Sequence, residues 1–189
     1  MVINIKRVVT LYIIELIILI FLSVMGFYIG PMFIGRSLLN TLKNELMSTV
    51  SLGPDYIFYH NLVIDTLMAI PIIGPAFFVI ALVMTGFILG VYVSYATNSL
   101  LFLVISILVT MFLPHGIIEL LAYAFSTAGS LTFTRNLLNA IRGKESIGKG
   151  SVIMLVIYYA ISVLLLFIAA NIEYFEIISL KGLLSKLLS

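Results

Sequence analysis

The sequence predicts an all-α protein, a polytopic membrane helical bundle. We expect about five transmembrane helices, a re-entrant or interfacial segment and two amphipathic surface helices in a single membrane domain covering 1–189. Of the 189 residues, 62% are hydrophobic and only 10% are charged, with a mean hydropathy of +1.26. A soluble domain of this size has too much surface to hide so many apolar side chains. The apolar residues also gather into runs that are long enough to cross a lipid bilayer.

Composition excludes several classes of site and partner. The chain has no cysteine, which excludes disulfides and thiolate metal sites. Its net charge of +2 is too small to indicate a nucleic-acid partner. No nucleophile and base have the spacing that hydrolysis needs, so we expect neither an enzyme nor a cofactor. The lipid bilayer is the expected surrounding.

The first quarter of the chain predicts one span and one surface helix. Lys6 and Arg7 precede an apolar run over 8–34, which we interpret as a retained first span because it is too long for a signal-peptide core. Glu15 lies inside this run, and we expect it near the inner interface or against a neighbouring helix. Leucines at helical spacing predict an outer amphipathic helix over 35–56.

The middle of the chain contains the segment that is hardest to place. Residues 57–73 are apolar but short, polar in three places, and interrupted by proline and glycine. We therefore predict a re-entrant or interfacial segment, which is tolerated where it is buried in protein. Three further spans are predicted at 74–95, 98–113 and 114–134.

The remainder predicts a loop, a span and a surface helix. Residues 135–150 form the most basic segment and are expected to be a cytoplasmic loop. Residues 152–171 are the fifth predicted span, and 173–189 form an amphipathic C-terminus. Small residues mark faces where helices approach each other closely. These predicted packing positions are Gly74, Gly86, Gly90, Ala124 and Ala128.

Charge counting predicts the orientation in the cell membrane. Short loops rich in Lys and Arg remain cytoplasmic, which places both the N-terminus and 135–150 inside. An even number of crossings must separate these two segments. The four full spans between them satisfy this condition only if 57–73 does not cross. The C-terminus is then outside.

One stretch inside the apolar region carries the candidate site. Pro114, His115 and Glu119 would each be costly in hydrocarbon, so they require a reason. The predicted topology places them in the same half of the membrane as polar residues of 57–73. The full set of candidate residues is Pro114, His115, Gly116, Glu119, His60, Asn61 and Asp65. Such a cluster could lock the segment in place, bind a cation, relay a proton, or form a surface where a partner docks.

The same stretch carries a family resemblance. Leu113-Pro114-His115-Gly116, followed by Glu119, Ala122 and Ala128-Gly129, resembles the signature of the stage II sporulation protein M family of integral membrane proteins. Two upstream segments, His60-Asn61-Leu62 with Gly74 and the run Thr85-Gly86-Phe87-Ile88-Leu89-Gly90, resemble that family's Asn-rich segment and its Asn-Gly-x-x-x-Gly span. Thr85 stands in place of an Asn, and Leu62 stands where a second Asn is usual. The resemblance covers about residues 57–134.

The resemblance implies a non-enzymatic scaffold. In spore-forming bacteria, the family member is a membrane component of the engulfment machinery and holds a cell-wall hydrolase and its partner. For this chain it implies a scaffold or assembly protein whose partners are other membrane proteins or further copies of itself. The intramembrane acids leave a second hypothesis open, a small channel or transporter that uses a His/carboxylate cluster.

Overall fold

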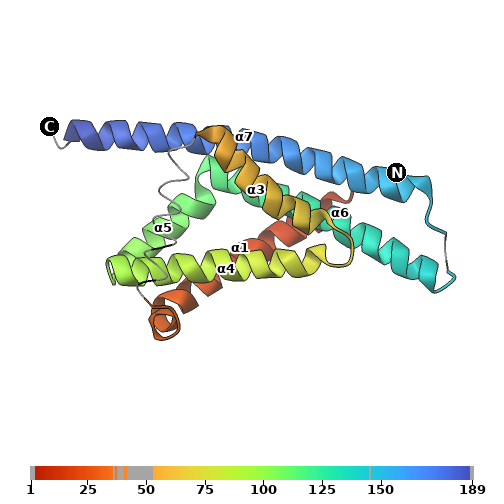
Figure 1. Cartoon of the computed structure of the whole chain (residues 1–189), viewed down its shortest axis with the longest axis horizontal. Helices are drawn as coiled ribbons and strands as arrows, with labels where there is room; N and C mark the ends of the chain where they lie inside the picture. Colours follow the sequence, from red (N-terminus) through yellow and green to blue (C-terminus); the bar gives the residue numbers. More distant parts are fainter. Residues whose placement is uncertain (1–2, 36, 38–40, 42–52, 145, 188–189) are drawn as a thin grey trace.

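The structure, a computed structural model, describes residues 3–35, 37, 41, 53–144 and 146–187, and this part of the chain is helical without strands. Its elements are α1 (Ile5–Ile29), the 3₁₀ turn η1 (Gly30–Met32), α3 (Pro54–Ala69), α4 (Gly74–Ala96), α5 (Leu100–Phe112), α6 (Pro114–Ile141) and α7 (Lys149–Leu187). They form one elongated bundle, with α7 along its full length (Figure 1). The predicted all-α bundle is confirmed. Most of the predicted surface helix at 35–56 lies outside the described residues.

Four segments of the described chain are long and apolar enough to cross a membrane. They are Ile5–Met32, Gly74–Ala96, Pro114–Ile141 and Lys149–Ser179. The predicted third span at 98–113 is instead a 13-residue helix, α5. At 1.5 Å per residue it is about 20 Å long, which is less than the ~30 Å of a hydrocarbon core. The chain is therefore a multi-pass membrane protein in which α5 and the 16-residue α3 are short.

Contacts between α1 and α4 show that these two helices run in the same direction. Gly86 lies against Leu19 and Leu22, and Gly90 lies against Ser23 and Phe27, so the residue numbers rise together along both helices. The predicted topology had a span at 74–95 antiparallel to the first one. The structure corrects this expectation.

The chain returns between α1 and α4 through α3. Ser126 and Ser130 of α6 donate hydrogen bonds to the carbonyl oxygens of Asp65 and Ile70, so α3 is parallel to α6. On α7, Tyr158 lies against Gly129 of α6, whereas Ser162 donates to the carbonyl oxygen of Ala122, so α6 and α7 are antiparallel. Helices α1, α4 and α7 thus run one way, and α3 and α6 run the other way (Figure 1).

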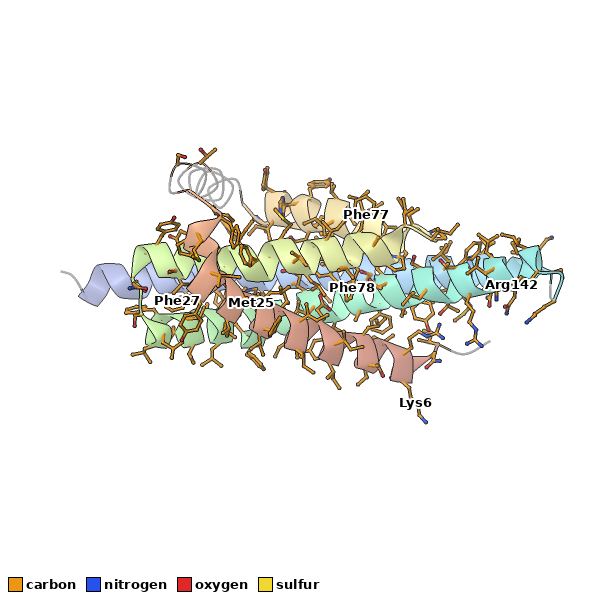
Figure 2. The ribbon with its side chains drawn as sticks, turned by 90° about the horizontal axis from the view of Figure 1, so that it is seen from below. Lys6, Met25, Phe27, Phe77, Phe78 and Arg142 are labelled. Carbon is orange, nitrogen blue, oxygen red and sulfur yellow. The ribbon has the colours of Figure 1, made fainter. Side chains whose placement is uncertain are left out.

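The short helices explain why the predicted direction of the 74–95 span was wrong. The predicted topology took the short segment 57–73 as not crossing in order to keep the number of passes even, but a helix packed inside protein need not match the bilayer thickness. It also counted 98–113 and 114–134 as two opposed spans, whereas α5 and α6 form one bent path. The number of passes before the basic loop remains even. Lys6 and Arg142 therefore lie at the same end of the molecule (Figure 2).

Two predicted boundaries shift because helices continue past them. Helix α6 extends to Ile141, beyond the predicted end at 134, and this shortens the basic loop. The predicted span at 152–171 and the C-terminal helix at 173–189 are joined in α7, a single helix of 39 residues. No glycine or proline lies at the predicted break. Asn171 there donates to the carbonyl oxygen of Phe167 one turn earlier, at 2.7 Å.

Glycines set the distance between α1 and α4. A Cβ atom at Gly90 would meet the carbonyl oxygen of Ser23 and would lie 2.6 Å from the amide nitrogen of Phe27. Gly26 of α1 makes the reciprocal approach to the carbonyl oxygen of Phe87. The backbones of the two helices are therefore in direct contact, which is how small residues drive helix association in lipid.

Candidate functional site: a carboxyl cluster beside the α5–α6 kink

The site is built around a kink in the chain. Leu113 is extended, with φ −67° and ψ 157°, because a following proline disfavours the helical conformation. Pro114 then starts α6, where its missing N–H costs nothing. Gly116 packs directly against the carbonyl oxygen of Thr110, an approach that leaves no room for a Cβ atom. The corner between α5 and α6 lies next to α7 (Figure 1).

His115, at the start of α6 beside this kink, forms an ion-pair contact with α7. Its Nδ1 atom contacts Oε2 of Glu176 on α7, with both side chains mostly buried. The partner of His115 is therefore on α7 and is not one of the acids expected from the sequence. Glu173 lies one turn earlier on α7. A cavity of about 230 Å³ is lined here by Val109, Thr110, Leu113, His115, Glu173, Glu176 and Ile177.

Glu119 lies one helical turn after His115 on α6. Its Oε1 atom accepts a hydrogen bond of 2.9 Å from the hydroxyl of Tyr123. Its carboxyl group is within electrostatic range of His115 and Glu173, and also of Glu15 on α1. Glu119 thus connects the polar groups at the kink with those deeper in the bundle.

Glu15 and Asp65 are the most deeply buried acids of the described chain. Both have 0% of their surface exposed, and none of their carboxyl oxygens has a hydrogen-bond partner. Glu15 is within electrostatic range of Asp65 as well as Glu119. Unsatisfied carboxyl groups in an apolar interior are costly. Of the two positions expected for Glu15, near the inner interface or against a neighbouring helix, the structure shows the second, in the interior of the bundle.

The surroundings of Asp65 are rich in hydroxyl groups. The side chains of Ser126 and Ser162 lie beside its carboxyl group. Both hydroxyls donate to carbonyl oxygens, Ser126 to Asp65 itself at 3.2 Å and Ser162 to Ala122 at 2.9 Å. The serines can therefore offer the carboxyl group a proton only by rotating away from these carbonyls.

The structure does not bring His60 into the cluster. Asn61 and Asp65, four residues apart, share the buried face of α3, whereas His60 is exposed. One residue turns the helix by about 100°, so His60 and Asn61 point in different directions. The expectation that His60 shares a site with His115 and Glu119 is corrected accordingly.

The predicted packing residues line contacts between helices. Gly74 lies against the carbonyl oxygen of Met68, with Ser130 Oγ 2.8 Å from where its Cβ would be. Ala124 and Ala128 are completely buried in a cluster with Val8 and Tyr158. These small side chains place α6 close to both α1 and α7.

Sequence reasoning missed Glu173, Glu176 and Tyr123. The two acids were assigned to a surface helix because the chain was divided at 171–173, although they continue an apolar helical run without interruption. Tyr123 is four residues after Glu119, a spacing that places both on one helix face. Among the described residues, no three His, Asp or Glu side chains are close enough to hold a metal ion.

Comparison with known protein families identifies the family to which this chain is similar. Residues 37–175 match the family described as Stage II sporulation protein M. The match includes α3, the kink and Glu173, and it leaves Glu15 and Glu176 outside its limits. No significant match was found among curated proteins or among solved structures. The matched region covers well over half of the chain, so this membrane protein belongs to the stage II sporulation protein M family.

Proposed function

We propose that the protein is a non-enzymatic scaffold that holds another integral membrane protein, or a second copy of itself, in the cell membrane. The observation that carries the proposal is the length of α7. Its 39 residues extend about 58 Å, roughly twice the ~30 Å of a hydrocarbon core. The C-terminal part of α7 projects beyond the other helices (Figure 1).

The exposed side chains of α7 beside the kink, where the projecting part begins, favour a protein partner. Phe175 and Ile178 are 70% and 51% exposed, and they flank the partly buried Glu176. A long helix that mixes apolar and acidic side chains can dock against a neighbouring helix through both kinds of contact. Helix α7 is held on the bundle by its packing against α6 and α3, for example where Tyr158 lies against Gly129, and it presents this surface from there.

Native mass spectrometry and site-specific photo-crosslinking test the scaffold. Membranes from the protein's own host are solubilised gently, and we expect one further polypeptide, or a second copy, at fixed stoichiometry. A photo-crosslinking amino acid at Phe175 should join that same partner. The same probe at Ile17 of α1, which is 62% exposed, should not. A monomer without crosslinks at Phe175 would reject the proposal.

We propose that the N-terminus is cytoplasmic and that the far end of α7 is outside. The basic N-terminus and the loop between α6 and α7 lie at one end of the bundle, and basic segments are retained in the cytoplasm. The chain lacks cysteine, so single cysteines report cleanly. In intact cells, a membrane-impermeant maleimide should label Ala96→Cys at the end of α4 and spare Ser146→Cys in the basic loop. The opposite labelling pattern would reverse the orientation.

A further inference from the structure

One face of α6 carries a nearly continuous file of polar side chains through the bundle. His115, Glu119, Tyr123, Thr127, Ser130 and Thr134 follow one another at spacings of three or four residues, which places them on one side of the helix. We call these six residues the α6 file. Thr127 and Ser130 are at most 1% exposed, and Tyr123 is also buried. A spanning helix does not need such a stripe in order to pack, because apolar side chains would fill the same space.

The neighbouring helices add carboxyl groups to the middle of the α6 file. Tyr123 is within electrostatic range of Asp65 from α3 and Glu15 from α1. The carboxyl oxygens of both acids and the hydroxyl of Thr127 are buried without a hydrogen-bond partner. Helices α1 and α3 therefore bring two unsatisfied carboxyl groups, each able to take up and release a proton, close to Tyr123 in the middle of the α6 file. The ion pair recorded in the described chain, His115 with Glu176, leaves these two acids without a counter-ion.

The α6 file begins at a cavity and ends at an exposed turn. Its first residue, His115, lines the cavity of about 230 Å³ beside Glu173 and Glu176. Its last residue, Thr134, accepts a hydrogen bond of 2.7 Å from the amide N–H of Ile72 in the turn between α3 and α4, where Ile72 is 59% exposed. The buried groups are thus placed between a cavity at one end of α6 and an exposed turn further along the bundle.

We propose that the α6 file, completed by Glu15 and Asp65, conducts protons between the cavity beside His115 and the exposed turn between α3 and α4. This activity goes beyond the proposed scaffold role. Carboxyl, hydroxyl and imidazole groups both accept and donate protons, so a relay needs no channel wide enough for a hydrated ion. Each group takes a proton from one neighbour and gives one to the next. The chain ends unchanged, and the membrane potential or a pH difference drives the net movement. Acids inside membrane helices characteristically mark such pathways.

Protons are favoured over metal cations by the spacing of the groups. No three His, Asp or Glu side chains of the described chain form a cage for a metal. The acids contact hydroxyl-bearing side chains, as in Glu119 with Tyr123 and Asp65 beside Ser126. A relay requires proton donors and acceptors next to one another, and the hydrogen bond between Tyr123 and Glu119 is one such step.

Proton flux into vesicles tests the proposal. The full chain is reconstituted into liposomes that contain a pH-sensitive dye, and a potassium diffusion potential is imposed with valinomycin. We expect the lumen to acidify faster than in protein-free liposomes, at the same rate in sodium and choline buffers. Glu15→Gln and Asp65→Asn should each reduce the rate to that of protein-free liposomes. His60→Gln, a change at an exposed titratable residue of the same helix as Asp65, should retain the wild-type rate.

Folding and scaffolding are monitored separately from flux. Each variant should elute from gel filtration at the wild-type position. If Asp65→Asn does not fold, Glu119→Gln replaces it, because it removes the charge of another carboxyl group of the path and should likewise reduce the rate to that of protein-free liposomes. A wild-type rate equal to that of protein-free liposomes overturns the proposal. So does wild-type flux in both Glu15→Gln and Asp65→Asn, or a rate that requires sodium. The Phe175 crosslink reports the scaffold independently, because Phe175 lies on the exposed surface of α7.

Discussion

Gly90→Ala is expected to force α1 away from α4 and to lower the free energy of unfolding in detergent by about 2–3 kcal/mol. The added methyl group would meet backbone atoms of Ser23 and Phe27, which cannot rotate aside as a side chain can. The sign is informative, because alanine otherwise stabilises a helix relative to glycine by roughly 0.5–1 kcal/mol. Thermal unfolding followed by fluorescence-detected gel filtration measures the change.

Two other glycines serve as graded controls for this prediction. At Gly86 the nearest atom to an added Cβ would be the Cβ of Leu22 at 2.9 Å, so Gly86→Ala should cost less than Gly90→Ala. At Gly148 the nearest such atom is 4.0 Å away, so Gly148→Ala should leave the unfolding temperature unchanged. Equal effects at Gly90 and Gly148 would contradict the direct backbone contact between α1 and α4.

Glu15→Met is expected to stabilise the protein by about 1–3 kcal/mol, because it replaces a buried carboxyl group that has no hydrogen-bond partner with an apolar side chain of similar size. Stability is measured by the same thermal unfolding assay. Leu16→Met, a change of similar size at the next position, is the matched control and should alter stability by less than ~1.5 kcal/mol. A large loss of stability in Glu15→Met would show that the carboxyl group is satisfied in the native state.

The expected gain also bears on function. Natural proteins retain destabilising groups chiefly where activity needs them. A variant that is more stable in detergent but conducts no protons would show that Glu15 is kept for the relay. A variant that is more stable and conducts normally would remove Glu15 from the relay.

Local features of this fold could be predicted from sequence, whereas the arrangement of helices could not. The spacing of Gly86 and Gly90 indicated a helix contact, but many helices could have supplied the partner. The parallel direction of α1 and α4 depends on α3, which is too short to count as a span by hydropathy. A helix as short as α3 is tolerated in the membrane because it is buried among other helices, and this burial is a property of the tertiary structure that the local sequence does not reveal.

For the candidate site, too, the local features could be predicted from the sequence and the contacts between helices could not. Pro114 and the residues after it stood out because polar groups are costly in an apolar run. The partner of His115 was missed, because Glu176 follows it by 61 positions and no local rule joins them. His60 was included because the predicted topology placed it in the same half of the membrane as His115, and helical phase excluded it. Glu15 was noticed, but its place in the cluster depends on how α1 packs against α6.

The brevity of α3 and α5 has a consequence for how the chain enters the bilayer during synthesis. A 13-residue segment that ends at a proline cannot be released into lipid alone, because its unpaired backbone groups would face hydrocarbon. α5 must therefore leave the insertion machinery together with α6, and the short α3 together with α4. His115 in turn has no partner until α7 arrives with Glu176. Biogenesis of this protein is thus expected to proceed by paired insertion, with the polar groups at the kink covered only after α7 has been made.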